Sequence, residues 1–118
     1  MAGKVSKEYI QSILVREDNI GMHAVGRALV ALHNRQTAFE KRSNNTVASN
    51  GIGFTPADAA MGSSHASYYL RNNFLTERQL KYWQRIERRG TARIAKYWRQ
   101  LIQVAKEKQI TEQTVEKG

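Results

Sequence analysis

The residues that could do chemistry are mostly basic and lie in the last third of the chain. Residues 71–108 hold eleven Lys and Arg against three Asp and Glu, a net charge of +8, while the whole chain of 118 residues carries +9. Guanidinium and ammonium groups bind phosphate oxygens through charge-assisted hydrogen bonds. The candidate nucleic-acid-binding residues are Arg78, Lys81, Tyr82, Arg85, Arg88, Arg89, Arg93, Lys96, Arg99 and Lys106. This concentration predicts contact with DNA or RNA, and a solvated helix face is the alternative.

The spacing of these residues fits a single helical face. At about 100° per residue, the basic side chains between residues 78 and 106 share an arc of about 140°, and the apolar ones share a different arc. The two sets keep this phase across Gly90, so we expect one long helix from about Glu77 to Gln109, with two helices broken at Gly90 as the alternative.

The triplet Lys-Tyr-Trp occurs twice within this region, at residues 81–83 and 96–98. In a continuous helix, Trp83 and Tyr97 fall on the apolar arc and Tyr82 on its border. We therefore expect Trp83 and Tyr97 to belong to the core, and Tyr82 to be available for stacking on a base. Arg85, Arg89 and Lys96 are expected to be exposed at the centre of the basic stripe.

Two other groups of residues have types and spacings that could support chemistry. SNGIGF, at residues 49–54, precedes a helix but completes no nucleotide-binding fingerprint, so a turn is the better interpretation. Asp58 and His65 share a helix face beside Ser63 and Ser64, which could suit acid–base chemistry or a metal. Without further ligands, a capping aspartate and a partly buried histidine are expected instead. No catalytic residue, metal ligand or cofactor-binding residue is predicted, and the chain is not expected to be an enzyme.

Composition indicates one soluble domain. The chain has one proline and no cysteine, so a disulfide framework and thiolate metal sites are excluded. No apolar run reaches the roughly 20 residues of a membrane span, and no secretory signal is evident. We expect a single helical domain over residues 1–118, with residues 109–118 as a frayed tail, and a cytoplasmic location without membrane contact.

Helical spacing of apolar residues predicts an all-α fold, a small bundle of about four helices ending in the long basic amphipathic helix. Ser6 is expected to cap the first helix, and Thr76 with Gln79 forms a capping box for the last. Phe54 is expected to fill the core between the second and third helices. Gln36, Thr37 and Glu40 follow one another at helical spacing and are candidates to bridge to the loop at residues 50–54. The second helix should run from about Met22 to Glu40, and the third from Pro56 to about Arg71, where Asn72-Asn73 breaks the chain. In the third helix, Thr55 is the expected N-cap, Pro56 the first helical residue, and Asp58 lies at the positive end of the dipole.

Three stretches together resemble a known family. They are RQT…E (35–40), NGIGFTPADAAMGSS (50–64) and LTERQL followed by KYWRQL (75–80 and 96–101). The chain is similar, over about residues 24–103, to small and largely uncharacterised proteins of bacteriophages and mobile elements, whose segments also occur attached to phage helicase- or primase-like proteins. The resemblance implies a phage origin, a location in the host cell cytoplasm, and a role near DNA replication or host takeover. It supplies no catalytic residues.

Two functions are consistent with the sequence. The first is a non-enzymatic protein that binds the phosphate backbone of nucleic acid with low sequence specificity. The alternative is a protein-interaction module, such as an inhibitor of a host enzyme or defence complex, whose basic face docks on an acidic partner from host or phage.

Overall fold

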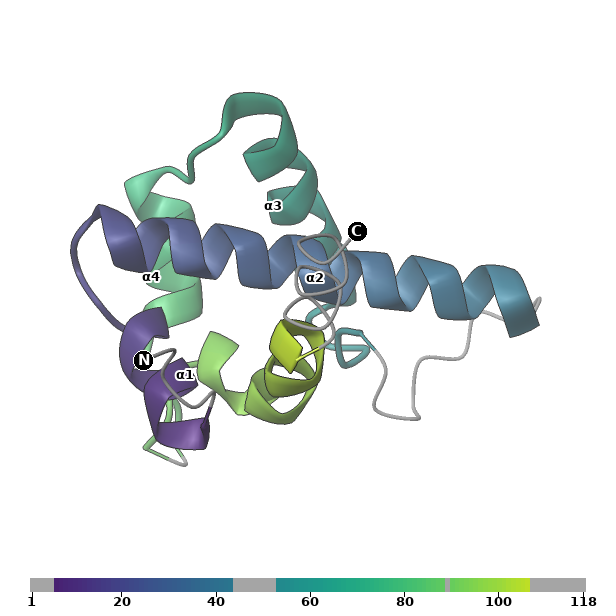
Figure 1. Ribbon diagram of the computed structural model, residues 1–118. Helices are drawn as coiled ribbons and strands as arrows, with labels where there is room; N and C mark the ends of the chain where they lie inside the picture. The colour runs from purple at the N-terminus through teal and green to yellow at the C-terminus, as the bar shows by residue number, and fades with distance from the viewer. Residues whose placement is uncertain (1–5, 44–52, 89, 107–118) are drawn as a thin grey trace, which may run out of the picture.

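The protein is an assembly of helices in the computed structural model, which describes residues 6–43, 53–88 and 90–106 (Figure 1). The helices are α1 (Lys7–Leu14), α2 (Asn19–Ser43), α3 (Ala59–Asn72), α4 (Glu77–Gln84) and the 3-10 helix η1 (Ile94–Tyr97), which continues directly into helical residues 98–106. Within these ranges, the only strand-like pairing is an isolated bridge between Ile86 and Ala92. The expected all-α class is confirmed.

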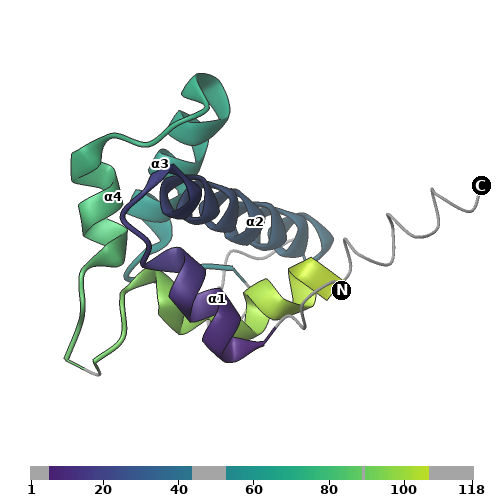
Figure 2. The same ribbon diagram turned by 60° about the vertical axis from the view of Figure 1, so that its left-hand side comes forward.

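Helix α2 is the centre of the fold. Figure 1 shows α3 on one side of α2, and α1 with residues 98–106 on the other. Helix α4 packs against α2 and η1, and η1 packs against α1, so the segment after α4 returns alongside α1, as Figure 2 shows. This arrangement brings residues from both ends of the described chain to one core.

The core depends on bulky aromatics placed against glycines. Trp83 and Phe54 are buried and pack 5.9 Å apart, measured between ring centroids. A Cβ atom at Gly62 of α3 would lie 2.5 Å from a ring carbon of Phe54, so only glycine leaves room for that ring. The backbone N–H of Phe54 also donates to Gln36 Oε1 of α2 at 3.2 Å. Phe54 therefore fills the space between α2 and α3, as its position in the sequence predicts.

The local capping signals act as expected. Ser6 Oγ accepts from the backbone N–H of Tyr9 at 3.2 Å and so begins α1. Thr76 and Gln79 form the reciprocal capping box of α4. Asn73 ends α3 with φ of 62°, in the left-handed region that asparagine tolerates better than most residues.

The predicted start of the third helix was wrong by three residues. Helix α3 begins at Ala59, and residues 56–58 form a turn in which the Asp58 N–H donates to the Thr55 carbonyl at 3.0 Å. Neither Thr55 nor Asp58 caps the helix through its side chain, because both side chains turn to Tyr97 instead. The contacts of Thr55 and Asp58 with Tyr97 thus replace the side-chain capping of α3 that the sequence predicted.

The predicted continuous helix from Glu77 to Gln109 was also wrong. Helix α4 ends at Gln84, and Arg85 is extended with ψ of 131°. The chain then reverses through Gly90, whose φ of 82° suits glycine, before η1 begins. The apolar phase persists across the break because Trp83, on α4, and Tyr97, in η1, are both buried in the same core.

Candidate nucleic-acid interface

Four of the predicted basic residues line α4 and the turn after it. Arg78 and Lys81 lie three residues apart on α4, and Arg85 follows at its end, so the three share one side of the helix. Lys81 pairs with Glu77 at 3.1 Å, but both side chains stay more than three-quarters exposed, at 76% and 82%. Such a pair is worth little and opens easily when a phosphate competes for the lysine. We call Arg78, Lys81, Arg85 and Arg88 the basic face.

The turn over residues 85–93, here called the arginine turn, places Arg88 in solvent. Its arms are joined by hydrogen bonds from the Glu87 N–H to the Thr91 carbonyl at 3.0 Å and from the Arg93 N–H to the Arg85 carbonyl at 2.9 Å. The turn projects from the rest of the protein (Figure 2). Arg88 and Gly90 are exposed there, while Arg89 lies outside the described residues. Two residues on each arm, Arg85 and Glu87 on one and Thr91 and Arg93 on the other, are thus hydrogen-bonded across the turn that carries Arg88.

The base of the arginine turn is fixed by a buried carboxylate. Asp58 has no exposed surface, and its oxygens accept from Arg93 Nη1 at 2.9 Å, Lys96 Nζ at 2.9 Å and the Tyr97 hydroxyl at 2.5 Å. Burial alone would raise the pKa of Asp58, but the hydrogen bonds from Tyr97, Lys96 and Arg93 outweigh it and leave the pKa below its ordinary value. Asp58 is therefore ionised and ties the returning chain to the start of α3.

Lys96 is not an exposed member of a basic stripe, contrary to the expectation. Its side chain is 25% exposed and that of Arg93 is 23%, and both also face Glu87, at 4.0 Å and 3.2 Å. Two cations and two carboxylates thus form a compensated network. Burying either cation without such partners would cost several kcal/mol, which explains why these two residues turn inward together.

Tyr82 serves the same network. The Arg93 guanidinium lies 4.5 Å from the centre of the Tyr82 ring, and its Nη1 also donates to the Tyr82 hydroxyl at 3.3 Å. The Tyr82 ring further meets Trp83 edge-on at 5.0 Å. Arg93 therefore covers one face of the Tyr82 ring. The sequence predicted instead that this ring is available for stacking on a base.

The two Lys-Tyr-Trp triplets have different aromatics in the core. Trp83 is buried in the first triplet and Tyr97 in the second, as expected, whereas Trp98 is only partly buried. Two cations flank the Trp98 ring, with Lys7 Nζ at 5.1 Å and Arg99 at 5.2 Å from its centre. Sequence reasoning missed Lys7 and Trp98, because only the folded chain brings α1 beside η1.

The structure thus divides the predicted binding residues into groups. Arg78, Lys81, Arg85 and Arg88 gather on α4 and the arginine turn, and Arg99 and Lys106 are exposed on helical residues 98–106. Arg93, Lys96 and Tyr82 belong to the Asp58 network.

His65 has a structural hydrogen bond. The Trp83 Nε1–H donates to His65 Nδ1 at 2.9 Å, which requires a neutral ring nitrogen. Burial lowers the pKa of His65, in keeping with this role. Asp58 and His65 are therefore each engaged with different partners, and in the described part of the chain no three His, Cys, Asp or Glu residues cluster as metal ligands would. None of the described helices has the length and hydropathy to cross a membrane.

Comparison with protein-family models, curated proteins and solved structures found no match for this chain.

Proposed function

We propose that this protein binds nucleic acid without catalysis, and that the basic face on α4 and the arginine turn contacts the phosphate backbone. The observation that carries the proposal is the contrast among the basic residues. Arg93 and Lys96 are neutralised inside the fold, whereas Arg78, Arg85 and Arg88 have no carboxylate partner within the described residues. Unpaired, exposed arginines on a projecting turn suit bidentate contacts to phosphate.

The Asp58 network supports this function by making the turn rigid. Arg93 and Glu87 sit on opposite arms of the turn and pair at 3.2 Å, and Arg93 is held by Asp58 from α3. A preorganised turn loses less conformational entropy on binding than a free loop would. The network therefore anchors the arms of the turn from which Arg85 and Arg88 extend into solvent.

Sequence specificity is expected to be low. Backbone contacts position a protein on nucleic acid without reading base edges, and the sequence contains no motif that resembles a recognition helix with base-reading positions. The resemblance to phage proteins adds a biological setting to the proposal, as an accessory to DNA replication in the host cytoplasm.

The test is fluorescence anisotropy with labelled single- and double-stranded oligonucleotides at low salt. The variant Arg85→Gln/Arg88→Gln should bind more weakly than the wild type. The matched control, Arg27→Gln/Arg71→Gln, removes the same charge from exposed positions on α2 and α3 and should bind like the wild type. Failure of the wild type to bind any DNA or RNA would end the proposal.

A second candidate function is docking of the same basic face on an acidic protein. The observation that favours it is Ile86, which is 59% exposed between Arg85 and Arg88, since an apolar side chain amid cations is common at protein interfaces. A pull-down from bacterial lysate after nuclease treatment separates the two functions. A partner that survives nuclease, and that Ile86→Ser releases, would support the protein interface over nucleic acid.

A further inference from the structure

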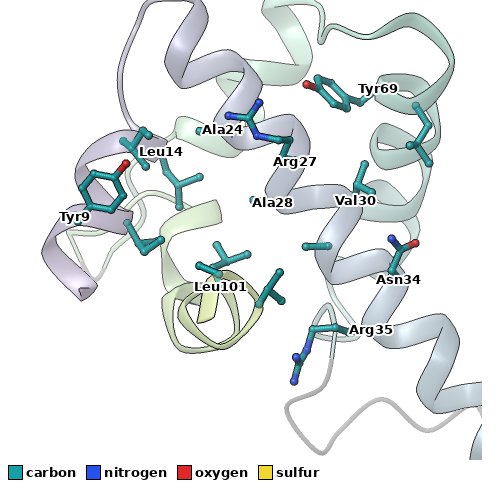
Figure 3. Close-up of a pocket in the computed structure, with 16 residues that line it drawn as sticks. Tyr9, Leu14, Ala24, Arg27, Ala28, Val30, Asn34, Arg35, Tyr69 and Leu101 are labelled. Atoms are coloured by element: carbon teal, nitrogen blue, oxygen red, sulfur yellow. The ribbon is translucent and has the colours of Figure 1, made fainter. Parts of the chain in front are cut away.

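A second surface, distinct from the basic face, is an open apolar groove of about 640 Å³ along α2. Its walls come from α1, α2, α3 and helical residues 98–106, and none of its lining residues belongs to α4 or the arginine turn. Figure 3 shows Tyr9 and Leu14 of α1 and Leu101 on one side of the groove, across from α2.

Large apolar side chains at the margins of the groove are left in water. Tyr9 is 52% exposed and Leu70 is 61% exposed, although both lie beside the buried Leu14 and Tyr69. Two exposed apolar side chains from different helices thus border the same groove. The groove is thus unlike the solvated side of an ordinary surface helix.

Among the described residues that line the groove, the two charged side chains, Arg27 and Arg35, are both cationic. Arg27 is exposed, while Arg35 Nε donates to Gln100 Oε1 at 3.2 Å and so joins α2 to the helical residues on the other wall. Arg27, Ala31 and Arg35 all line the groove and succeed one another at four-residue spacing on α2, so the small alanine lies between the two cations on the same side of the helix.

We infer that this groove binds an acidic amphipathic helix from another protein. The apolar floor accommodates residues at i, i+3, i+4 and i+7 of such a helix, and Arg27 and Arg35 pair with carboxylates beside them. A helix fits better than an extended peptide, because the groove is walled by helices whose backbone groups are already bonded and offers no open sheet edge. A second copy is disfavoured, since a symmetric contact would bring two chains of charge +9 together.

The test uses a synthetic fluorescein-labelled helical peptide with leucines at i, i+3, i+4 and i+7 and glutamates between them. We expect it to bind the full-length wild type, and the same peptide with lysines in place of glutamates to bind at least tenfold more weakly. Ala31→Glu places a carboxylate between Arg27 and Arg35 and should weaken binding of the acidic peptide at least tenfold. Ala60→Glu, at an exposed position of α3 away from the groove, is the matched control and should bind normally.

Melting curves of both variants establish that they are folded. Equal binding of the acidic peptide to the wild type and Ala31→Glu would overturn the proposal, as would equal binding of the acidic and basic peptides. Concentration-dependent dimerisation of the wild type that Ala31→Glu abolishes would also overturn it, in favour of a second copy in the groove. Arg85→Gln/Arg88→Gln should bind the peptide normally, so this test stands apart from the nucleic-acid test.

Discussion

Replacing Asp58 by asparagine should destabilise the protein strongly. The substitution keeps the shape of the side chain but removes the charge that Arg93 and Lys96 share, and it turns an amide N–H₂ toward groups that are themselves donors. Of the described carboxylates, the two cations would then keep only that of Glu87, at 3.2 Å from Arg93 and 4.0 Å from Lys96. Breaking a buried ion pair by removing one partner costs about 3–5 kcal/mol. At about 4 °C per kcal/mol for a domain of this size, Tm should fall by about 12–20 °C.

Thermal melts followed by circular dichroism, with urea titration for the free energy of unfolding, measure this loss. Glu77→Gln is the control, because the pair between Glu77 and Lys81 is exposed and should contribute less than about 1 kcal/mol.

The stability of the wild type at acid pH offers a second measurement. Because the folded pKa of Asp58 is depressed, its stabilisation is complete above the ordinary carboxyl pKa and is lost as pH falls through the folded value. An Asp58→Asn variant with wild-type Tm would refute the role given to the network.

Three further substitutions test the interior. Trp83→Ala should cost about 3–5 kcal/mol in urea unfolding, since the side chain is fully buried; unchanged stability with lost oligonucleotide binding would show instead that Trp83 faces a ligand. Tyr97→Phe should cost about 1.5–3 kcal/mol, because it removes a hydrogen bond to the charged Asp58, and a neutral outcome would mean that this bond contributes nothing. Because the folded pKa of His65 is depressed, the free energy of unfolding should fall as pH drops from about 7 through that pKa, by at most about 1.4 kcal/mol per pH unit. In melts at several pH values, His65→Phe should flatten this slope. An equal slope in both proteins would contradict the structural role of His65.

Features set by neighbouring residues could be predicted from the sequence. Ser6, Asn73 and the Thr76–Gln79 box act within a few residues of themselves, so their side chains decide where a helix begins or ends. The apolar pattern likewise identified Trp83 and Tyr97 as core residues, because burial of large aromatics dominates the packing of a small domain.

The Asp58 network could not be predicted, because Asp58 lies 35–39 residues before its partners Arg93, Lys96 and Tyr97 and meets them only in the folded chain. The basic residues of a continuous stripe were expected to face solvent, yet a single buried carboxylate draws Arg93 and Lys96 inward. The break after Gln84 had one local signal, Gly90, and the shared apolar phase on either side concealed it. The phase is shared because α4 and η1 both place apolar side chains, Trp83 and Tyr97, in the same core. Of the predicted binding surface, the exposed positions Arg78, Lys81, Arg85 and Arg88 stay together on the folded protein.

The residues 109–118, expected as a tail, lie outside the described residues, as do residues 49–52 of the glycine loop.

The salt dependence of oligonucleotide affinity tests the central claim most directly. Each phosphate contact contributes about 0.9 to the slope of log K against log salt concentration for double-stranded DNA. The wild type should show a steep negative slope, and Arg85→Gln/Arg88→Gln should reduce its magnitude by about 1.8, because two contacts are removed. Arg27→Gln/Arg71→Gln, which has the same net charge, should leave the slope unchanged. Equal slopes for the two double variants would contradict the assignment of binding to α4 and the arginine turn.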